Sequence, residues 1–438
     1  MKIAYIAAGA AGMYCGNCLR DHALALAMRD LDGADDVDLT LVPTYTPLLT
    51  DSPQGDEVRG SKLFFNGVRT YLAQKVPFFR TRRAWLDRVF GSRYLVGTLS
   101  RMQASTDPSK LGDITVSMLR GEDGHQSAEL DELASWLHGE RPDLVHLSNA
   151  LLLGMVRRIK DACGAPIVCS LQSEDIFVEG LVEPYRRQAL ELIRNRAEDV
   201  AAFVSVSHFY GEYCATHFGI EPDRITVVHS GVAVDEHQPA PFRSAGDELT
   251  IGFLARMAPE KGLGSLCAAF EMIARRPGME RVRLKAAGYL PNSEVRWLAT
   301  LRRHLARAGL GARVELLGTV DRTTKLDFLS QIDVLALPTR RAEPKGLSIF
   351  EALASGVPLV LPDHGTFPEI VEKSGAGVLH APNDVEHLAA ELERVLLDEE
   401  LRRKLGVAAR RSAQEHFHSA RMAAETLDVY RRVLDQPS

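Results

Sequence analysis

Short, continuous apolar segments recur along the chain, and most of them end in polar residues that lead into a helical pattern. In the first half these segments are 2–7, 37–41, 166–171, 202–206 and 225–228, with a further strand within 141–149; in the second half they are 249–254, 282–287, 314–317, 334–337 and 359–361. A strand that is apolar throughout has both faces buried, as in a parallel sheet covered by helices on both sides. The alternation therefore predicts an α/β fold built on doubly wound parallel sheets.

The strand series is interrupted once and then starts again, which indicates two domains. Residues 233–246 contain Pro239, Pro241 and several charges, as a linker does. A chain of 438 residues is also too long for one ordinary hydrophobic core. We expect two Rossmann-like domains, at 1–235 and 247–415, that face each other across a cleft containing the active site. The helical pattern of 416–438 predicts a C-terminal helix that packs back across the domains.

The composition narrows the function classes. Hydrophobic residues make up 45% of the chain and charged residues 25%, which is ordinary for a soluble globular protein, and the net charge of -6 argues against general binding of nucleic acid. No apolar run reaches membrane-spanning length, and residues 1–7 lack the flanks of a secretory signal. We therefore expect a cytoplasmic protein.

One segment departs from this acidic background. Residues 77–101 carry six arginines among five aromatic side chains. Such a segment can form an interfacial helix attracted to anionic lipid, which predicts a peripheral membrane contact, or a wall of the site for an acidic acceptor. Alternatively, the arginine stems cover the apolar face of a helical insertion.

The six cysteines are scattered along the chain and do not form a disulfide framework, so reduced thiols are expected. Cys15 and Cys18 form a CxxC motif, and His22 follows one helical turn later, which is compatible with a metal or redox site. No fourth ligand is evident, and cysteine is common as a small buried residue. Both alternatives stay open.

A glycine-rich loop follows the first strand. Gly9, Gly12 and Gly16 recur at spacings of three and four, which is not the dinucleotide-binding pattern GxGxxG. Its backbone can still approach a ligand closely at the carboxyl end of a strand, where open α/β sheets bind their ligands.

The segment 343–358 carries the strongest chemical signal. Glu343 and Glu351 have seven residues between them and flank a turn and the start of a short helix, where the backbone amides of Gly346 and Leu347 lie unpaired. A ligand can meet acidic side chains and free amides together there. The structural alternative is a capping box, in which Ser348 and Glu351 satisfy each other's amides.

Two cations are predicted at the same edge of the second sheet. Arg256 and Lys261 follow the strand 249–254, and together with the amides of Gly346 and Leu347 they can hold a diphosphate and stabilise it as a leaving group without a metal. Glu351 can then accept the ribose hydroxyls. Glu343 can contact the transferred sugar and offset positive charge at its anomeric carbon. The alternative for both cations is a pair of solvated loop charges.

The motifs as a set resemble a known family. Residues 252–262, 286–288, 317–320 and 343–358 are similar to the donor domain of family 4 retaining glycosyltransferases, which have the GT-B fold, and 142–146, 204–207 and 228–232 resemble strand ends of the same family. The resemblance covers nearly the whole chain. The combination of two glutamates separated by seven residues with the preceding arginine and lysine is more specific than any of its parts.

The resemblance implies a function for each site residue. It implies a metal-independent transfer of a hexose from a nucleotide-diphosphate sugar to a hydroxyl of a glycan, lipid or small-molecule acceptor, with retention of the anomeric configuration and without a further cofactor. Arg256 and Lys261 would bind the diphosphate, Glu343 would act at the sugar, Glu351 would bind the ribose, and the loop of Gly12 would lie near the reaction centre. Carbohydrate metabolism, such as bacterial glycan biosynthesis, is the expected context.

The sequence also departs from the family pattern. Gln172 stands where many members have a histidine that contacts the sugar, and Lys345 replaces a usual aromatic residue. Gln172 is therefore a candidate contact to donor or acceptor whose role is open. The alternative functions are a nucleotide-sugar epimerase of the same fold and a degenerate, non-catalytic sugar-binding protein.

Overall fold

The computed structural model describes residues 1–8, 16–31, 37–44, 108–244 and 246–436. The chain forms two compact units: Met1–His229 together with Met422–Ser438 make unit 1, and Ser230–Arg421 make unit 2. The chain thus leaves unit 1 after His229 and returns to it at Met422. Each unit is built around its own parallel sheet.

Unit 1 contains a six-stranded parallel sheet with the order β2-β1-β3-β4-β5-β6. Its strands are β1 (Lys2–Ala7), β2 (Asp38–Pro43), β3 (Leu144–Leu147), β4 (Ile167–Leu171), β5 (Ala202–Ser205) and β6 (Ile225–Val227). β3 and β4 are buried along their whole length. This burial confirms the prediction that the apolar runs are strands covered on both faces.

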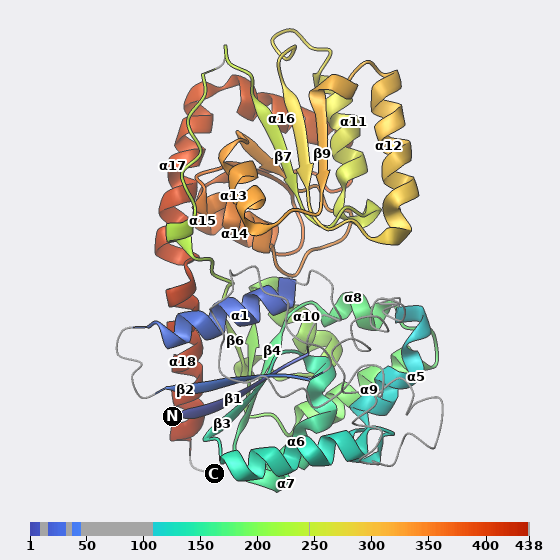
Figure 1. The fold of residues 1–438 in the computed structure, drawn as a ribbon, viewed down its shortest axis with the longest axis vertical. Coiled ribbons are helices and arrows are strands. Elements are labelled where there is room, and N and C mark those ends of the chain that lie inside the picture. The colour runs from blue at the N-terminus through green and yellow to red at the C-terminus, as the bar shows by residue number, and fades with distance from the viewer. Residues whose placement is uncertain (9–15, 32–36, 45–107, 245, 437–438) are drawn as a thin grey trace. The chain divides into compact units, whose positions relative to one another are not determined.

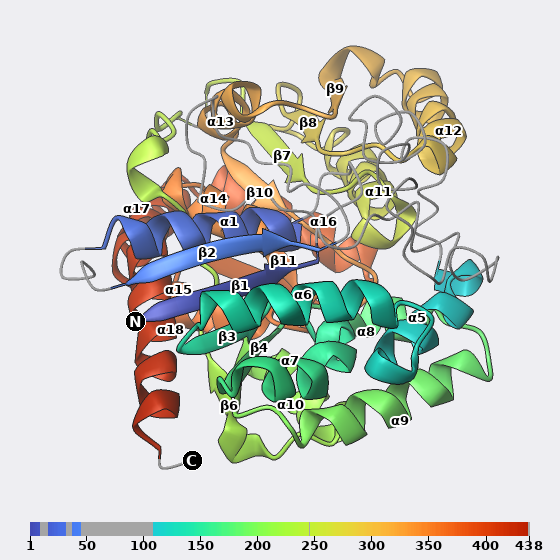
Figure 2. The same cartoon turned by 60° about the horizontal axis from the view of Figure 1, so that its bottom comes forward.

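Helices cover both faces of this sheet (Figure 2). On one face, Ile3 and Tyr5 of β1 pack with Leu24 of α1 (Gly16–Arg29) and Leu427 of α18 (Ser419–Asp435). The other face packs against α6 (Ser127–Glu140), α7 (Val156–Cys163), α9 (Tyr185–Ala197) and α10 (His208–Phe218). Among its described residues, this unit also contains the short helices α5 (Gly112–Leu119) and α8 (Glu174–Glu179).

Unit 2 contains a second six-stranded parallel sheet, with the order β12-β11-β10-β7-β8-β9. Its strands are β7 (Thr250–Leu254), β8 (Arg283–Ala287), β9 (Val314–Gly318), β10 (Val334–Ala336), β11 (Leu359–Pro362) and β12 (Gly377–His380). Starting from β7, the strands follow in chain order on both sides, β8 and β9 on one side and β10, β11 and β12 on the other. The first strand of the unit therefore pairs with both β8 and β10, as in a Rossmann sheet.

Along the chain, the helices of unit 2 alternate with its strands as far as α16, and α17 follows α16 directly (Figure 1). They are α11 (Leu263–Ile273), α12 (Val295–Arg307), α13 (Arg322–Ser330), α14 (Leu347–Ala354), α15 (Phe367–Ser374), α16 (Val385–Leu397) and α17 (Glu399–His416). α11 packs beside α16, whereas α14 and α15 pack against α17. Both units thus have the doubly wound parallel architecture that the sequence predicts.

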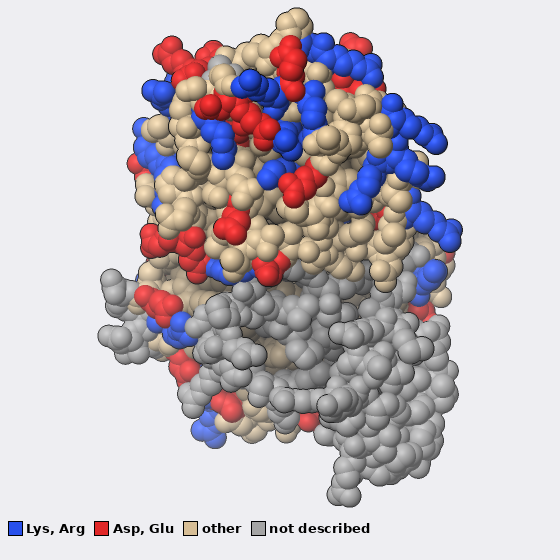
Figure 3. Space-filling model, turned by 45° about the horizontal axis from the view of Figure 1, so that its top comes forward, with Lys and Arg blue, Asp and Glu red and all other residues tan. Residues whose placement is uncertain are grey.

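Charged side chains of both signs are interspersed over the described surface of unit 2 (Figure 3). Basic side chains gather on the side where α12 lies, and Arg296, Arg302, Arg303 and Arg307 of this helix are exposed. Within the described residues, no helix has the length and apolar character needed to cross a bilayer. The basic and aromatic segment 77–101, for which we predict a membrane contact, lies outside the described residues.

Candidate functional site

The loops after β7 and β10 meet at the point where the strand order of unit 2 reverses. β7 pairs with β8 on one side and with β10 on the other. The connections from these strands leave in opposite directions, and ligands of open α/β sheets bind in the crevice that results at the carboxyl ends. The loop after β7 contains the short 3-10 helix η7 (Pro259–Lys261), and the loop after β10 contains Glu343.

Lys261 and Glu343 form an ion pair across these two loops. The Nζ of Lys261 lies 2.5 Å from Oε2 of Glu343, and the two side chains are only 17% and 12% exposed. Partial burial weakens solvent screening, so this contact is stronger than a surface ion pair of the same length. The structure therefore brings together the cation and the acid that the sequence assigns to one site.

Glycines allow these loops to come so close. Gly262 has a φ of +87°, and a Cβ on it would lie 1.8 Å from the carbonyl oxygen of Pro338. Gly365 has a φ of +64°, and its Cβ would lie 2.5 Å from the backbone nitrogen of Glu343. Both positions exclude a side chain by conformation and by space. The amide of Thr366 also donates to the carbonyl of Glu343 at 2.9 Å, which fixes the backbone that carries the carboxylate.

Arg256 lies in the same loop as Lys261 but is differently placed. Its side chain is 45% exposed and forms an ion pair with Glu260 four residues later. The contact is an exposed i, i+4 pair, which contributes little to stability. The guanidinium can therefore exchange its carboxylate partner for a phosphate at small cost.

Helix α14 begins as the sequence predicts, at the turn of Gly346 and Leu347. Gly346 is the N-cap residue, no side chain caps the helix, and the amide of Ile349 donates to the carbonyl of Gly346 at 2.9 Å. Ser348 is the second residue inside the helix. The capping-box alternative is therefore wrong, because Ser348 does not occupy the N-cap position and the carboxylate of Glu351 has a different partner.

That partner is Lys325, which the sequence analysis did not identify. Its Nζ lies 2.7 Å from Oε1 of Glu351, with side-chain exposures of 9% and 13%. Lys325 comes from α13, where it precedes the buried Phe328 and Leu329 by three and four residues and so shares their face. A lysine on the apolar face of a predicted helix was the signal that could have revealed it.

Unit 1 places Gln172 at the carboxyl end of β4, inside a buried polar cluster. Its Nε2 donates to Oδ1 of Asp21 and to the carbonyl of Ser148, each at 2.8 Å. Tyr5 donates to the same carboxylate oxygen of Asp21 at 2.7 Å. Both amide hydrogens of Gln172 are thus used within unit 1. Gly12, the other residue predicted on this side, lies outside the described residues.

The turn after Gln172 has an unusual backbone. Ser173 adopts a φ of +82°, which is uncommon for a residue with a side chain, and such strained conformations cluster at functional sites. Glu174 then accepts hydrogen bonds from Tyr210 and from the amides of Ala150 and Gln172. Burial, together with the charge of Glu174, raises the pKa of Asp175 to about 6. A carboxyl group that titrates near neutral pH therefore follows β4.

The predicted CxxC site is described only in part. Cys15 lies outside the described residues, whereas Cys18 and His22 are buried on α1. Among the residues that the structure describes, no three histidine, cysteine, aspartate or glutamate side chains are grouped as metal ligands are. The metal or redox role of Cys15 and Cys18 thus stays a hypothesis.

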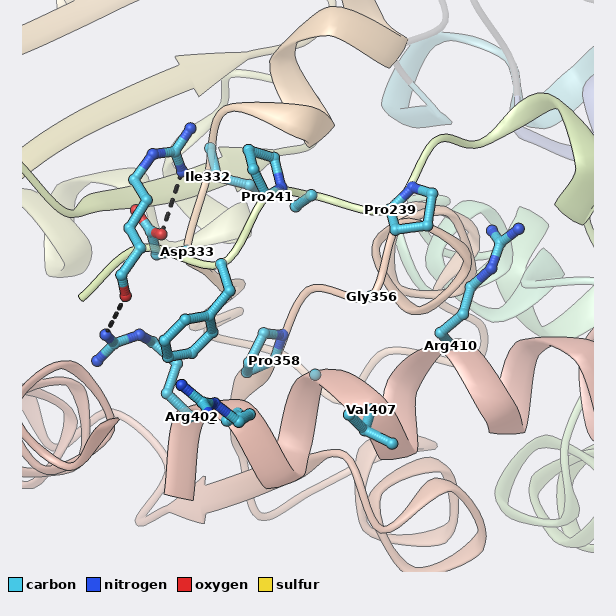
Figure 4. Close-up of a pocket in the computed structure, with 14 residues that line it drawn as sticks. Pro239, Pro241, Ile332, Asp333, Gly356, Pro358, Arg402, Val407 and Arg410 are labelled. Atoms are coloured by element: carbon cyan, nitrogen blue, oxygen red, sulfur yellow. Dashed lines mark hydrogen bonds and ion pairs between the residues drawn. The ribbon is translucent and has the colours of Figure 1, made fainter. Parts of the chain in front are cut away.

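A cavity of about 230 Å³ lies at the other end of the unit 2 sheet (Figure 4). Its lining includes Ile332 and Asp333, which precede β10, and Pro358, which precedes β11. Its arginines are engaged by the protein, since Arg243 pairs with Asp333 at 3.1 Å and Arg402 donates to the carbonyl of Arg243 at 2.7 Å. The cavity is thus separate from the edge with Lys261 and Glu343, and its charges hold the linker in place.

Two family descriptions match adjoining parts of the chain. Residues 116–236 match the family described as Glycosyltransferase Family 4, and residues 234–412 match Glycosyl transferases group 1. The second match contains Arg256, Lys261, Glu343 and Glu351.

Curated relatives extend the similarity over most of the chain. The chain is 27% identical over 417 residues to a glycogen synthase of Mycobacterium tuberculosis, which covers 93% of this chain and 89% of the relative. It is 30% identical over 264 residues to an alpha-maltose-1-phosphate synthase of Mycolicibacterium smegmatis, covering 55% of this chain and 65% of that protein.

Solved structures show the same fold. Anabaena Alr3699/HepE, in complex with UDP and glucose, aligns with a TM-score of 0.68 at 17% identity and covers 99% of this chain and 100% of its own. Sucrose-phosphate synthase from Thermosynechococcus elongatus aligns with a TM-score of 0.69 at 18% identity, covering 99% of this chain and 98% of its own. Together with the family matches, these findings confirm the resemblance seen in the sequence. The chain belongs to the group 1 glycosyltransferases of family 4, enzymes with the GT-B fold.

Proposed function

We propose that this glycosyltransferase moves a hexose from a nucleotide-diphosphate sugar to an acceptor hydroxyl, with retention of configuration and without a metal. The observation that carries the proposal is the ion pair between Lys261 and Glu343 at the switch point of the unit 2 sheet. In the donor, the diphosphate is bonded directly to the sugar. A cation that binds the diphosphate and an acid that contacts the sugar must therefore lie close together. Lys261 and Glu343 meet that requirement.

The diphosphate is bound by positive charge from three sources. Lys261 exchanges Glu343 for a phosphate oxygen, and Arg256 exchanges Glu260 in the same way. The amides at the start of α14, at Gly346 and Leu347, add the positive end of a helix. These groups stabilise the negative charge that grows on the leaving diphosphate, so the proposed transfer does not require a divalent cation.

The two glutamates bind the rest of the donor. Glu343, released from Lys261, accepts hydrogen bonds from the hexose and offsets positive charge at the anomeric carbon. Glu351 accepts hydrogen bonds from the ribose hydroxyls. Glu343 is the catalytic residue of this proposal because it alone acts at the reacting sugar.

The transfer itself needs no nucleophile from the protein. The acceptor oxygen forms a bond to the anomeric carbon on the face from which the diphosphate leaves, while the bond from that carbon to the phosphate oxygen breaks. The acceptor's proton passes to the departing phosphate oxygen. Configuration is retained because the new bond and the broken bond share one face.

Several finer features stay predictions. These are the cleft between two facing domains, the position of the Gly12 loop beside the reaction centre, and a sugar contact by Gln172. The same holds for a cytoplasmic location and for a lipid contact of residues 77–101. The acceptor is a glycan, a lipid or a small molecule.

Turnover assays with UDP-, GDP- and ADP-hexoses and a panel of acceptors test the proposal. UDP-glucose is the first donor to try, because a similar structure was solved with it. We expect nucleotide release in the presence of EDTA and an NMR spectrum of the product that shows the donor's anomeric configuration. Conversion of the donor to its epimer without acceptor would instead identify an epimerase. Donor binding without any turnover would identify a sugar-binding protein.

A further inference from the structure

The carboxylate of Glu351 is held by a residue of a neighbouring helix. Lys325 of α13 contacts Oε1 of Glu351 on α14 at 2.7 Å, and less than a seventh of either side chain is exposed. A lysine and a glutamate buried to this extent lose most of their hydration, so such a pair adds little net stability compared with an apolar pair. The pair fixes geometry, since each charge is confined to the position of the other.

The helix that carries Lys325 is itself well anchored. Asp321 caps α13 by accepting a hydrogen bond from the amide of Thr324 at 2.8 Å. Phe328 and Leu329, on the face that Lys325 shares, are buried in the core of unit 2. The position of the ammonium group is therefore set by a rigid element and not by a loop.

The backbone of Glu351 is fixed as well. Ser355 donates its hydroxyl hydrogen to the carbonyl of Glu351 at 3.1 Å, so His237, whose Nδ1 lies 3.0 Å from the same hydroxyl oxygen, must be the donor in that contact. Burial, with Lys325 and Arg410 nearby, lowers the pKa of His237 to about 4. His237 is thus neutral near pH 7 and does not compete with Lys325 for the carboxylate.

We propose that Lys325 is a positioning residue that orients Glu351 toward the ribose and so makes the enzyme select ribonucleotides over 2'-deoxyribonucleotides. This inference rests on the proposed function, in which Glu351 binds the ribose. The terminal torsion of a glutamate is broad, so its carboxylate plane rotates unless a partner holds it. The contact of Lys325 with Oε1 fixes that plane, and Oε2 can then accept a hydrogen bond from a ribose hydroxyl. A carboxylate held in this way loses a charged hydrogen bond when one hydroxyl is missing.

The test compares the binding of two ligands to four proteins by calorimetry. The probes are whichever of UDP, GDP and ADP binds the wild type most tightly, and its 2'-deoxy counterpart. The proteins are the wild type, Lys325→Met and Lys325→Arg, with Lys285→Met as a matched control, because Lys285 also pairs with a glutamate, Glu315, at 3.3 Å. Thermal melting verifies that each protein is folded, and Lys325→Gln replaces Lys325→Met if the latter does not fold.

The wild type should bind the ribonucleotide roughly tenfold or more tightly than the deoxy form, the effect of one hydrogen bond to a charged group. Lys325→Met should reduce this ratio to about threefold or less, whereas Lys325→Arg and Lys285→Met should preserve most of it. An unchanged ratio in folded Lys325→Met would overturn the inference.

Failure of the proposed function has a different signature. If no nucleotide binds the wild type, or if Glu351→Gln binds both probes as the wild type does, the ribose role of Glu351 is wrong and the inference about Lys325 is overturned with it. If Glu351→Gln no longer prefers the ribonucleotide over its 2'-deoxy form while Lys325→Met still does, the ribose role of Glu351 holds and the positioning role of Lys325 is rejected.

Discussion

Lys261 and Glu343 are 82 positions apart in the sequence, yet their side chains form an ion pair of 2.5 Å. Lys261 follows β7 and Glu343 follows β10, each in the loop at the carboxyl end of its strand. β7 and β10 are paired neighbours in the sheet, and the strand order reverses between them. In this ion pair, each group neutralises the charge of the other. In the proposed function, donor binding replaces this one contact by two, with phosphate on Lys261 and sugar on Glu343.

Replacing Lys261 by alanine should reduce turnover by about 100-fold or more, because the growing charge on the diphosphate loses a preorganised cation. The free energy of unfolding should fall by only about 1–3 kcal/mol, the cost of leaving Glu343 without this partner. Steady-state kinetics and urea denaturation measure the two effects. Lys285→Ala is the control, since its pair with Glu315 lies outside the candidate site. Near wild-type turnover in folded Lys261→Ala would disprove the diphosphate role.

Glu343→Gln should separate product affinity from catalysis. The amide has no charge to hold Lys261, so the lysine is available to phosphate, and the free nucleoside diphosphate should bind equally well or up to about tenfold more tightly. Turnover should nevertheless fall by about 100-fold, because the acid that acts at the sugar is gone. Calorimetry with the diphosphate and kinetics with the sugar donor test this pair of opposite effects. Loss of diphosphate affinity together with turnover would mean that Glu343 has a structural role only.

Replacement by alanine should have opposite effects on stability at two glycines that are two positions apart, Gly262 and Gly264. At Gly262 the backbone is left-handed, and the added Cβ would lie 1.8 Å from the carbonyl oxygen of Pro338, so Gly262→Ala should cost about 3 kcal/mol or more and impair the site. Gly264 lies within α11, and its Cβ would meet only Trp297 at 3.8 Å. Gly264→Ala should therefore stabilise the protein by about 0.5–1 kcal/mol. Equal effects in chemical denaturation would contradict the geometry of the Gly262 turn.

His237 should make the folded state sensitive to acid. Its pKa is about 4 in the folded protein and near 6.5 when unfolded, so between these values the unfolded chain binds the extra proton. The free energy of unfolding should thus fall as the pH drops from 6.5 toward 4, by up to about 3 kcal/mol. His237→Gln should remove this part of the pH dependence, and the exposed His416→Gln should not. Identical pH profiles for His237→Gln and wild type would show that the histidine is not buried as described.

Much of the fold could be predicted because it depends on local apolar patterns. The predicted strands 249–254 and 359–361 correspond to β7 (Thr250–Leu254) and β11 (Leu359–Pro362) within one residue. Parallel sheets bury their strands on both faces, so a continuous apolar run is a direct sign of them. The common edge that carries Lys261 and Glu343 followed from this topology.

The sequence did not reveal features that depend on contacts between distant elements. The ion pair of Lys325 with Glu351 joins two helices that only the folded sheet brings together. A local capping box seemed equally suited to Glu351, and it is wrong because the N-cap is Gly346, two residues before Ser348. Similarly, the left-handed backbone of Ser173 has no local sequence signal. Neither does the pKa of Asp175, which is raised by burial after β4 and by the charge of Glu174.

Binding of a nucleotide sugar to the wild type and to Lys261→Ala tests the central claim most directly. Calorimetry with UDP-glucose, GDP-mannose and ADP-glucose should show that the wild type binds at least one of them, and that Lys261→Ala binds the same donor at least about tenfold more weakly, as loss of a charged contact to phosphate requires. Lys285→Ala should bind it as the wild type does. Equal affinity of the wild type and Lys261→Ala for that donor, with both proteins folded, would contradict the assignment of this edge of the unit 2 sheet as the donor site.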